Sequence, residues 1–231
     1  MTLPLIPSSY KQVEEHIYSG FEHDNHAPYD SKAKLYERVV RSSIYNKLMW
    51  GTTPSDYIRF AKEALDSCTG TILDVGCGGL SHTGKLYAHS TKQLILLDYS
   101  IEMLRLGKAR ILKHHNPFPE NIHMLHADAF NLPFAKESLD NVVSFGVMHL
   151  FSRKAEYVTN LLDVLKTGGR FYFTTHTTDR RLSRRYIEHL QKQHEISKAL
   201  SSAENLAFFT GKATELHQRM VGNMVFVWGV K

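Results

Sequence analysis

Short apolar runs alternate with amphipathic segments through the middle of the chain. The apolar runs are bounded by turn residues, which is typical of buried strands: Thr71–Val75, Gln93–Leu97, Ile122–His126, Asn141–Phe145 and Arg170–Thr175. Helical spacing occurs between them in Gly84–Ala88, Ile101–Lys113 and Lys154–Leu165. This alternation predicts a doubly wound α/β fold with a mainly parallel sheet.

The two ends of the chain differ from this alternating middle. Residues 31 to 65 carry apolar side chains at helical spacing, and an interruption at Gly51–Pro54 divides them into two helices. The segment up to about Asp30 contains His and Pro, and we expect it to be loose. The run Met224–Val230 predicts a strand at the C-terminus. We therefore expect an N-terminal helical segment, residues 1–68, and an α/β core, residues 69–231.

Length and composition limit the class of protein. A chain of 231 residues, 42% hydrophobic and 22% charged, can bury one substantial core but is short for two domains. The proline-interrupted start, Met1–Pro7, does not resemble a secretory signal, and no later stretch has the roughly 18 apolar residues of a membrane span. The cysteines are Cys68 and Cys77, and a disulfide at the second, inside a glycine turn, would be awkward. These features favour the reducing cytoplasm.

The positive charge of the chain is modest, with a formal net charge of +5 and a pI near 9.1. Basic residues become denser late in the chain, where the spacing is helical: Arg180, Arg181, Arg184, Arg185, Lys192 and Lys198. Glu188 and Glu195 interrupt them. We therefore favour a solvated helix face over a nucleic-acid-binding surface.

The strongest local motif is the glycine turn that follows the first buried strand, Asp74-Val75-Gly76-Cys77-Gly78-Gly79. Glycine lets a backbone turn sharply and approach a ligand closely, because no Cβ stands in the way. In open α/β sheets such a turn lies at the carboxyl ends of the strands, where ligands bind. The motif predicts a site for an adenosine-bearing ligand, and the alternative is a tight strand–helix connection without a ligand.

A second acidic residue, Asp98, ends the next strand, about twenty residues beyond the glycines. A carboxylate at this position can accept hydrogen bonds from both hydroxyls of a ribose. It can also cap the following helix, since Asp98 and Ser100 both precede Ile101. The two interpretations are compatible.

Two later segments indicate which ligand this is. Asp128-Ala129 is followed by Leu132-Pro133-Phe134 and then by Asp140-Asn141-Val142, and Leu165–Gly169 precedes the fifth strand. Together with the glycine turn and Asp98, this order resembles the class I S-adenosylmethionine-dependent methyltransferases over residues 71 to 175. The resemblance implies a Rossmann-like, seven-stranded sheet with an antiparallel C-terminal strand, and a helical N-terminal lid.

The resemblance also implies roles for particular residues. Asp74, Gly76 and Gly78 would hold the methionine end of the cofactor, and Asp98 its ribose. The remaining contacts would come from Met103 on the adenine, Asp128 and Ala129 at the adenine edge, and Phe145-Gly146 beside the transferable methyl group. One departure is Leu80, which stands where the family usually has its third glycine.

The acceptor end of the site is less clearly marked. His149 and His176 follow the fourth and fifth strands, so both should face the cleft, where either is a candidate general base or substrate contact. The N-terminal helices carry Tyr36, Tyr45 and Trp50, and such rings could close over the cofactor and exclude water. Packing against the sheet is the alternative for these rings.

Other functions share parts of this pattern. A nicotinamide-dependent oxidoreductase would use the same turn, but Ser81 occupies the place of its last glycine and Asp128 would have no role. A noncatalytic S-adenosylmethionine-binding module stays open, because of Leu80. The fourth strand does not end in an Asn/Asp-Pro-Pro-aromatic turn, and no cysteine near it could attack a cytosine. We therefore expect a small-molecule acceptor, with an RNA methyltransferase as the alternative.

Overall fold

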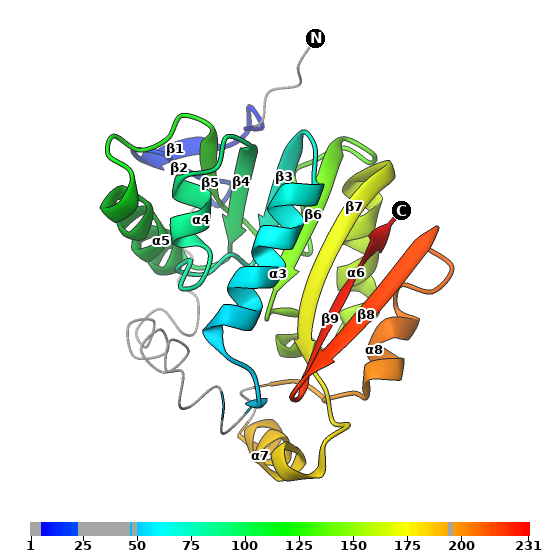
Figure 1. Cartoon of the computed structure of the whole chain (residues 1–231). Coiled ribbons are helices and arrows are strands. Elements are labelled where there is room, and N and C mark those ends of the chain that lie inside the picture. The colour runs from blue at the N-terminus through cyan, green and yellow to red at the C-terminus, as the bar shows by residue number, and fades with distance from the viewer. Residues whose placement is uncertain (1–5, 23–46, 48–49, 194–195) are drawn as a thin grey trace.

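In the described part of the chain, nine strands form one sheet in the order β1-β2-β5-β4-β3-β6-β7-β9-β8 (Figure 1). The structure is a computed structural model that describes residues 6–22, 47, 50–193 and 196–231. The strands are β1 (Lys11–Glu14), β2 (Ile17–Ser19), β3 (Thr71–Val75), β4 (Gln93–Asp98), β5 (Ile122–His126), β6 (Leu139–Phe145), β7 (Leu165–His176), β8 (Glu215–Val221) and β9 (Met224–Val230). The pairs β1·β2, β7·β9 and β8·β9 are antiparallel, and the other neighbouring pairs are parallel.

The predicted seven-stranded sheet is confirmed as the run β5-β4-β3-β6-β7-β9-β8, with an antiparallel strand at the C-terminus. Each strand predicted from the sequence is present. The main differences are at the ends: β4 includes Asp98, and β6 and β7 begin earlier, at Leu139 and Leu165. The carboxyl ends of β3, β4, β5 and β6 therefore lie along one edge of the sheet, where ligands bind in this class of fold.

Helices cover both faces of the sheet, as expected for a doubly wound fold (Figure 1). One face is covered by α3 (Pro54–Ser67), α4 (Gly84–Ala88) and α5 (Ile101–His114), whose Phe60, Tyr87 and Leu104 belong to one buried cluster. The other face is covered by α6 (Lys154–Val164), which contributes Tyr157 to a second cluster, and by α8 (Ser202–Ala207). Phe209, just after α8, belongs to the same cluster. Burying a large apolar side chain contributes roughly 1.5–3 kcal/mol, so these two layers stabilise the sheet.

The start of α3 explains why the second predicted N-terminal helix forms. Pro54 is its first residue, where a missing N–H costs nothing, and the Asp56 carboxylate accepts a 2.8 Å hydrogen bond from the Thr53 N–H. This helix is confirmed. The first predicted helix, with Tyr36 and Tyr45, lies outside the described residues.

The N-terminal segment that we expected to be loose contains a hairpin instead. β1 and β2 pair antiparallel, and β2 then adds to the sheet parallel to β5, with Ser19 opposite His126. Ile17 is fully buried there. The two strands have only four and three residues, too few to show a period of two in the sequence, and their structure comes from the pairing of β1 with β2 and of β2 with β5.

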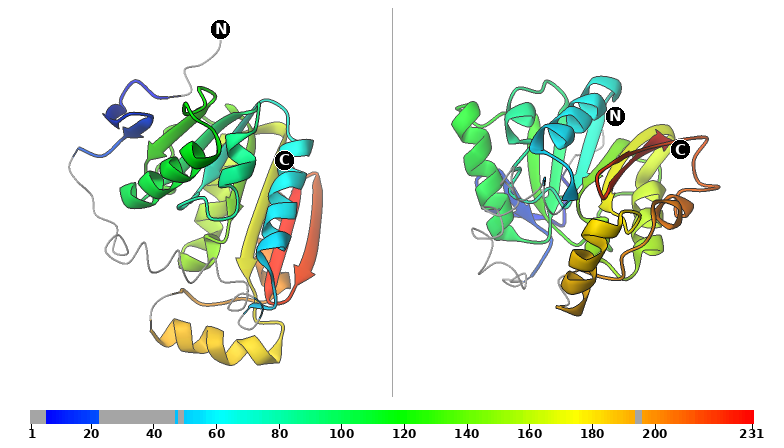
Figure 2. Two further views of the ribbon diagram at one scale, coloured as in Figure 1. Left: turned by 60° about the vertical axis from the view of Figure 1, so that its left-hand side comes forward. Right: turned by 60° about the horizontal axis from the view of Figure 1, so that its bottom comes forward.

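The late basic stretch forms α7 (Arg181–Lys192), which confirms the helical spacing. Figure 2 shows α7 lying beyond the carboxyl end of β7. Its Ile187 and Leu190 are buried, whereas the side chains of residues 181–186 are not described. Every described helix of the chain is too short or too polar to cross a lipid bilayer.

Candidate active site

The glycine turn after β3 is held against the end of the neighbouring strand. The N–H groups of Gly76 and Cys77 donate to the carbonyl oxygen of Leu97, at 2.8 and 3.0 Å. Gly76 has a φ of 71°, and a Cβ added to it would lie 2.5 Å from Cγ2 of Val147. Both the conformation and the close approach therefore require glycine here.

Two other glycines leave room for a ligand. Gly78, in the same turn, has a φ of 55°, and Gly146, directly after β6, has a φ of 72°. A Cβ at either position would meet no described atom within 4 Å. The turn therefore offers bare backbone and open space where the sequence predicts the methionine end of a cofactor and its methyl group.

Leu80 does not divert the loop. It adopts a φ of 57°, the left-handed conformation expected of the glycine that it replaces, and its side chain is buried at 1% exposure near Gly107 of α5. A left-handed residue with a Cβ costs roughly 1–2 kcal/mol, and burying a leucine contributes roughly 1.5–3 kcal/mol. Burial of the Leu80 side chain therefore offsets the cost of its left-handed backbone. Packing thus accounts for this departure from the family pattern.

Asp74, near the end of β3, faces the α4 side of the sheet. Its Oδ2 accepts a 2.8 Å hydrogen bond from the Tyr87 hydroxyl, and its Oδ1 is buried with no partner among the described residues. Burial raises the pKa of Asp74 to about 7, the bond from Tyr87 opposes this rise, and the charge of Asp98 adds to it. An unpaired buried carboxylate oxygen is costly, so it fits a site that receives a cationic group.

Asp98 connects the glycine turn to the start of α5. Its Oδ2 accepts a 2.7 Å hydrogen bond from the Gly78 N–H, and its Oδ1 accepts one of 2.9 Å from the Ser100 N–H. Ser100 is the N-cap residue of α5, with its Oγ accepting from the Met103 N–H. The capping role therefore belongs to Ser100, and Asp98 occupies the position where a ribose is predicted.

The residues predicted for the adenine lie on the two neighbouring segments. Met103 is buried in the first turn of α5. Asp128 and Ala129 follow β5, and the Asp128 Oδ1 accepts a 2.8 Å hydrogen bond from the Phe130 N–H. Because β4 and β5 are adjacent, these residues and Asp98 share one edge of the sheet. Their contacts with adenine remain a prediction.

Phe145 ends β6, and its ring pairs with that of Phe60 at 5.8 Å between centroids. The side chain thus lies on the α3 face of the sheet, and the turn at Gly146 is held by a hydrogen bond from its N–H to the Thr174 carbonyl oxygen. This arrangement puts the backbone of Gly146, with no Cβ, at the open end of β6.

The two candidate histidines lie together. His149, in the short helix η3 (Met148–Leu150), and His176, at the end of β7, have ring centroids 4.1 Å apart at an interplanar angle of 61°. Their Nδ1 atoms are buried without a described partner. Burial lowers the pKa of His176 to about 3, and burial together with His176 and Lys154 holds the pKa of His149 well below its usual value. Both rings are therefore neutral at physiological pH.

Trp50 covers this pair. Its ring stacks on His176 with centroids 3.9 Å apart, and it is 7% exposed. The Trp50 carbonyl oxygen accepts a 2.7 Å hydrogen bond from the Asn223 N–H in the β8–β9 turn. The ring thus both packs in the core and closes over His176, so the two interpretations of Trp50 are compatible.

Sequence reasoning missed Tyr87 and the β8–β9 turn. Tyr87 lies in a helix of only five residues, where a single buried hydroxyl has no sequence signature. Gly222 comes against Trp50: a Cβ on it would lie 2.0 Å from the Trp50 carbonyl oxygen. The pair Gly222-Asn223, directly before the apolar run of β9, is a recognisable turn signal, but the contact of this turn with Trp50 spans most of the chain.

Residues 67–221 match the profile of the protein family described as "Methyltransferase domain". An uncharacterized chloroplastic methyltransferase of Arabidopsis thaliana is 34% identical over 146 residues, which cover 61% of this chain and 40% of that protein. The ubiquinone/menaquinone biosynthesis C-methyltransferase UbiE of Pseudomonas aeruginosa (strain LESB58) is 28% identical over 173 residues, 71% of this chain and 65% of that one. This chain thus spans less than two thirds of the length of either relative.

Solved structures give the same fold. The geranyl diphosphate C-methyltransferase of Streptomyces coelicolor A3(2), determined with Mg²⁺, geranyl diphosphate and S-adenosyl-L-homocysteine, has a TM-score of 0.63 at 12% identity, covering 90% of this chain and 84% of that one. The matched profile covers more than half of the sequence, and the glycine turn leads from the parallel sheet into the predicted cofactor site. This chain therefore belongs to the class I S-adenosylmethionine-dependent methyltransferases, with S-adenosylmethionine as its cofactor.

Proposed function

We propose that this chain transfers the methyl group of S-adenosylmethionine to a small-molecule acceptor, and that His176 and His149 lie at the acceptor end of the site. The observation that carries the proposal is the pair of buried, neutral imidazoles at the carboxyl ends of β6 and β7, 4.1 Å apart. They follow the same two strands whose ends adjoin the open space at Gly146.

The cofactor would be held along the edge formed by β3, β4 and β5. The Asp74 Oδ1 would receive the ammonium of the methionine part, and Gly76 and Gly78 would let it approach the backbone. Asp98 would accept from the ribose hydroxyls. Met103, Asp128 and Ala129 would surround the adenine, with Phe145 beside the methyl group. The unpaired buried oxygen of Asp74 and the open space at Gly78 support this fit.

When bound, the cofactor supplies an already activated methyl group, so the protein must mainly hold the acceptor in line with it. A neutral imidazole can also accept a proton from the acceptor once the negative charge that develops on the bound acceptor raises the lowered pKa of the ring, and general-base catalysis typically contributes 10²–10⁴-fold. The buried Nδ1 atoms of His149 and His176 have no described hydrogen-bond partner, so a ligand that reached them would not have to displace a protein hydrogen bond there. We assign the base to this pair.

Trp50 would close the acceptor end. Its ring shields His176 from water, which strengthens hydrogen bonds made there. Tyr36 and Tyr45 belong to the same proposed lid, within the N-terminal segment 1–68 that precedes the methyltransferase core, residues 69–231. The lid proposal rests on Trp50, whose contacts are described.

We further propose that the methyl group goes to carbon, on an acceptor that carries an acidic hydroxyl. The likeness to UbiE, whose name describes a C-methyltransferase, supports this. Removing the hydroxyl proton from a phenol or enol makes the adjacent carbon nucleophilic, and the histidine pair could take that proton. Hydroxylated aromatic rings are therefore the first acceptors to test.

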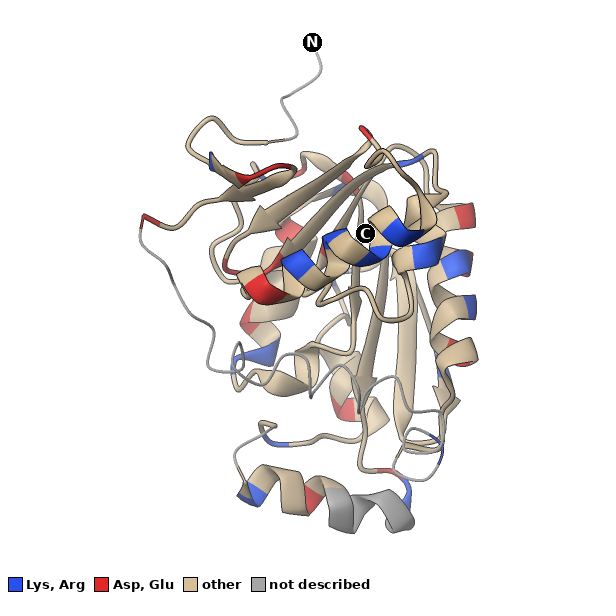
Figure 3. Ribbon diagram, turned by 90° about the vertical axis from the view of Figure 1, so that its left-hand side faces the viewer, with Lys and Arg blue, Asp and Glu red and all other residues tan. Residues whose placement is uncertain are grey.

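Charge distribution supports a small acceptor rather than a nucleic acid. On the side of the molecule shown in Figure 3, acidic and basic positions are interspersed. Nucleic-acid affinity depends on a continuous positive surface that meets many phosphates.

Both cysteines, Cys68 and Cys77, have free thiols, which supports the proposed cytoplasmic location.

The test is a methyl-transfer assay with radiolabelled S-adenosylmethionine, a panel of phenolic and enolic acceptors, and bulk RNA. We expect transfer to a small hydroxylated acceptor, with NMR locating the new methyl on carbon. His176→Gln and His149→Gln should lower kcat by at least 100-fold and change the affinity for S-adenosylhomocysteine by less than threefold.

The matched control is His115→Gln, an exposed histidine after α5, at the opposite end of the sheet. It should leave the rate unchanged. Methyl transfer to RNA alone would make an RNA methyltransferase the better assignment. Tight cofactor binding without transfer to any acceptor would favour a noncatalytic binding module, and full activity of both histidine variants would refute the proposed base.

A further inference from the structure

The N-terminal hairpin β1–β2 contacts both segments that are proposed to hold the adenosine part of the cofactor. Ser19 of β2 is the register partner of His126, and His126 is in turn the register partner of Asp98 on β4. The hairpin thus continues the sheet beyond β5 at the level where the ribose and adenine are proposed. It also lies outside residues 67–221, which match the family.

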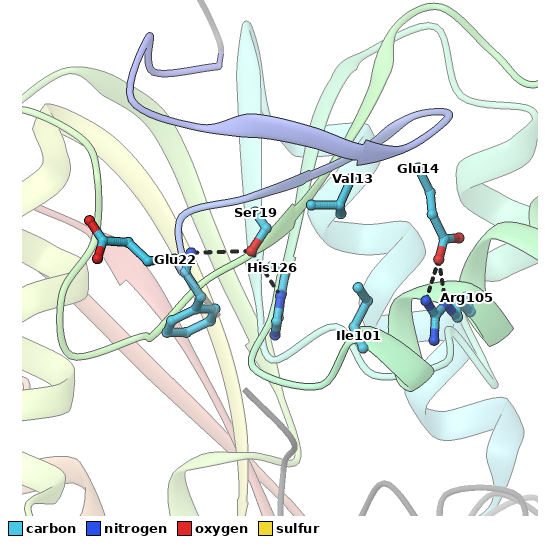
Figure 4. Close-up of a pocket in the computed structure, with 8 residues that line it drawn as sticks. Val13, Glu14, Ser19, Glu22, Ile101, Arg105 and His126 are labelled. Carbon is cyan, nitrogen blue, oxygen red and sulfur yellow. Dashed lines mark hydrogen bonds and ion pairs between the residues drawn. The ribbon is translucent and has the colours of Figure 1, made fainter. Parts of the chain in front are cut away.

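A chain of hydrogen bonds runs from the hairpin to the residue after Asp98. The His126 Nε2 lies 3.0 Å from the Tyr99 carbonyl oxygen, which can only accept, so Nε2 carries the proton. In the neutral ring Nδ1 then accepts from the Ser19 hydroxyl at 3.1 Å, and Ser19 Oγ accepts from the Phe21 N–H at 3.1 Å. Figure 4 shows Ser19 joined to His126 in this way. The hairpin therefore fixes the backbone that follows Asp98.

Aromatic contacts reinforce this connection. The Phe21 ring meets Tyr99 and His126 edge to face, with centroids 5.4 and 4.6 Å apart. Tyr10, which precedes β1, packs against Gly20, and burial together with the nearby charge of Asp128 raises the pKa of Tyr10 to about 12. The hairpin thus touches the β4 side of the proposed adenosine site through Phe21 and the β5 side through Tyr10.

A pocket of about 420 Å³ lies between the hairpin and α5, lined by Val13, Glu14, Ser19, Phe21, Glu22, Ile101, Arg105 and His126 (Figure 4). Arg105 of α5 forms an ion pair with Glu14 of β1, and this pair links the hairpin to the helix. The hairpin is therefore attached at several points, to both β5 and α5.

We propose that the hairpin is a working part of the cofactor site, in which Ser19 and Phe21 position the Asp98–Ile101 segment and thereby determine the affinity for the adenosine half of the cofactor. This rests on the placement of the adenosine under Proposed function. Ser19 acts through His126 on the Tyr99 carbonyl, and Phe21 acts on the Tyr99 ring, which is 37% exposed with Phe21 against it. Both are positioning residues, because they act on the ligand through Tyr99 and His126.

The experiment compares Ser19→Ala and Phe21→Ala with the wild-type chain by calorimetry, using S-adenosylhomocysteine and 5′-methylthioadenosine, which lacks the amino-acid part. We expect each variant to bind both compounds 5- to 20-fold more weakly, because the loss resides in the adenosine half. In a steady-state assay the KM for the cofactor should rise to match, with kcat and the KM for the acceptor unchanged. Ser19→Thr, which keeps the hydroxyl, should restore binding.

The control variant is Val13→Ala, which also lines the pocket and is 48% exposed, but whose aliphatic side chain can make neither a hydrogen bond to His126 nor a ring contact with Tyr99. It should bind both compounds as the wild type does. Unchanged binding of 5′-methylthioadenosine by Ser19→Ala and Phe21→Ala would overturn the proposal. A wild-type chain that binds S-adenosylhomocysteine but methylates no acceptor would refute the proposed function instead, and the binding comparison would still decide the role of the hairpin.

Discussion

The hydroxyl of Tyr87 donates a 2.8 Å hydrogen bond to Oδ2 of Asp74, while Oδ1 of the same carboxylate is buried without a described hydrogen-bond partner. Both residues are buried, at 1% and 3% exposure. A helix of five residues after the glycine turn thus orients the acidic side chain at the end of β3. The bond offsets part of the cost of burying this carboxylate and leaves one oxygen available for the cationic group that we propose binds there.

Removing this bond should weaken the cofactor site without unfolding the protein. We expect Tyr87→Phe to weaken S-adenosylhomocysteine binding by about tenfold, since a hydrogen bond to a charged group contributes roughly 1.5–3 kcal/mol. Tyr157→Phe is the matched control, because Tyr157 is equally buried and bonds to Ser144 at 2.8 Å on the other face of the sheet. Calorimetry on both variants makes the comparison. Equal losses in the two would show that Tyr87 has only a structural role.

Cofactor binding should weaken in acid. The pKa of Asp74 is raised to about 7, mainly by burial, so its carboxylate is increasingly protonated below that pH and cannot pair with an ammonium group. We expect the affinity for S-adenosylhomocysteine to fall between pH 8 and pH 5, approaching about tenfold per pH unit at the acid end. Asp74→Asn should bind weakly at every pH, with little slope. A wild-type affinity that is constant over this range would contradict the assignment.

Asp98 and Ser100 offer a clean separation of binding from stability. We expect Asp98→Ala to weaken cofactor binding by at least tenfold while the fold survives, because two charge-assisted bonds to the ribose would be lost. Ser100→Ala removes the N-cap of α5 and should cost about 1 kcal/mol of unfolding free energy. Chemical denaturation and calorimetry measure the two effects. If Asp98→Ala binds the cofactor as tightly as the wild type does, Asp98 does not bind the ribose.

The buried histidines should make the fold acid-sensitive. His176 has a folded pKa of about 3 against an unfolded value near 6.5, so the unfolded chain binds the proton first. Its contribution to stability is complete above pH 6.5 and is lost as the pH falls toward 3. Asp74 has the opposite sign, since its raised pKa makes its contribution decline as the pH rises from about 4 to 7.

We therefore expect the thermal midpoint of His176→Asn to fall less than that of the wild type between pH 7.5 and pH 5, and that of Asp74→Asn to fall more. His115→Asn is the control for the histidine and should follow the wild type, because the ring is exposed. If the thermal midpoints of all four proteins change with pH in parallel, neither His176 nor Asp74 has the shifted pKa that its burial implies.

The sequence predicted the elements whose hydrophobic period is undisturbed, and it missed those whose inward positions are polar. β8 is an edge strand, and one of its partly buried positions is Arg219, which lies over the rings of Phe60, Phe226 and Trp228 and pairs with Glu63. An arginine there breaks the apolar alternation that identifies a strand.

The site divides in the same way. Asp74, Gly76, Gly78 and Asp98 were identified because their spacing follows from the strand–turn–helix unit, which is local. Leu80 departs from the glycine pattern of the family, yet it keeps the left-handed backbone, and only its packing beside Gly107 explains why a leucine is tolerated. Contacts between distant segments have no local sequence signal, and the hydrogen bond from Tyr87 depends on how α4 packs on the sheet.

The turn between β8 and β9 should control methyl transfer through Trp50. A Cβ on Gly222 would lie 2.0 Å from the Trp50 carbonyl oxygen and 2.6 Å from the Gly51 carbonyl carbon, so Gly222→Ala must push this segment away. The stacking of Trp50 on His176 would then be lost, and the acceptor end would open to water. We expect kcat to fall by at least tenfold, while the affinity for S-adenosylhomocysteine changes by less than threefold, because the cofactor is proposed to lie along β3, β4 and β5.

The matched control is Gly211→Ala, in the turn before β8. Gly211 has a φ of 75°, close to the 60° of Gly222, but a Cβ there would meet no described atom within 4 Å. Both variants carry the same left-handed strain of roughly 1–2 kcal/mol, so any difference between them comes from the displaced segment. Tryptophan fluorescence should report exposure of Trp50 in Gly222→Ala alone. If the two variants lose activity equally, Trp50 does not close the acceptor end, and the N-terminal lid must be sought in the residues that precede it.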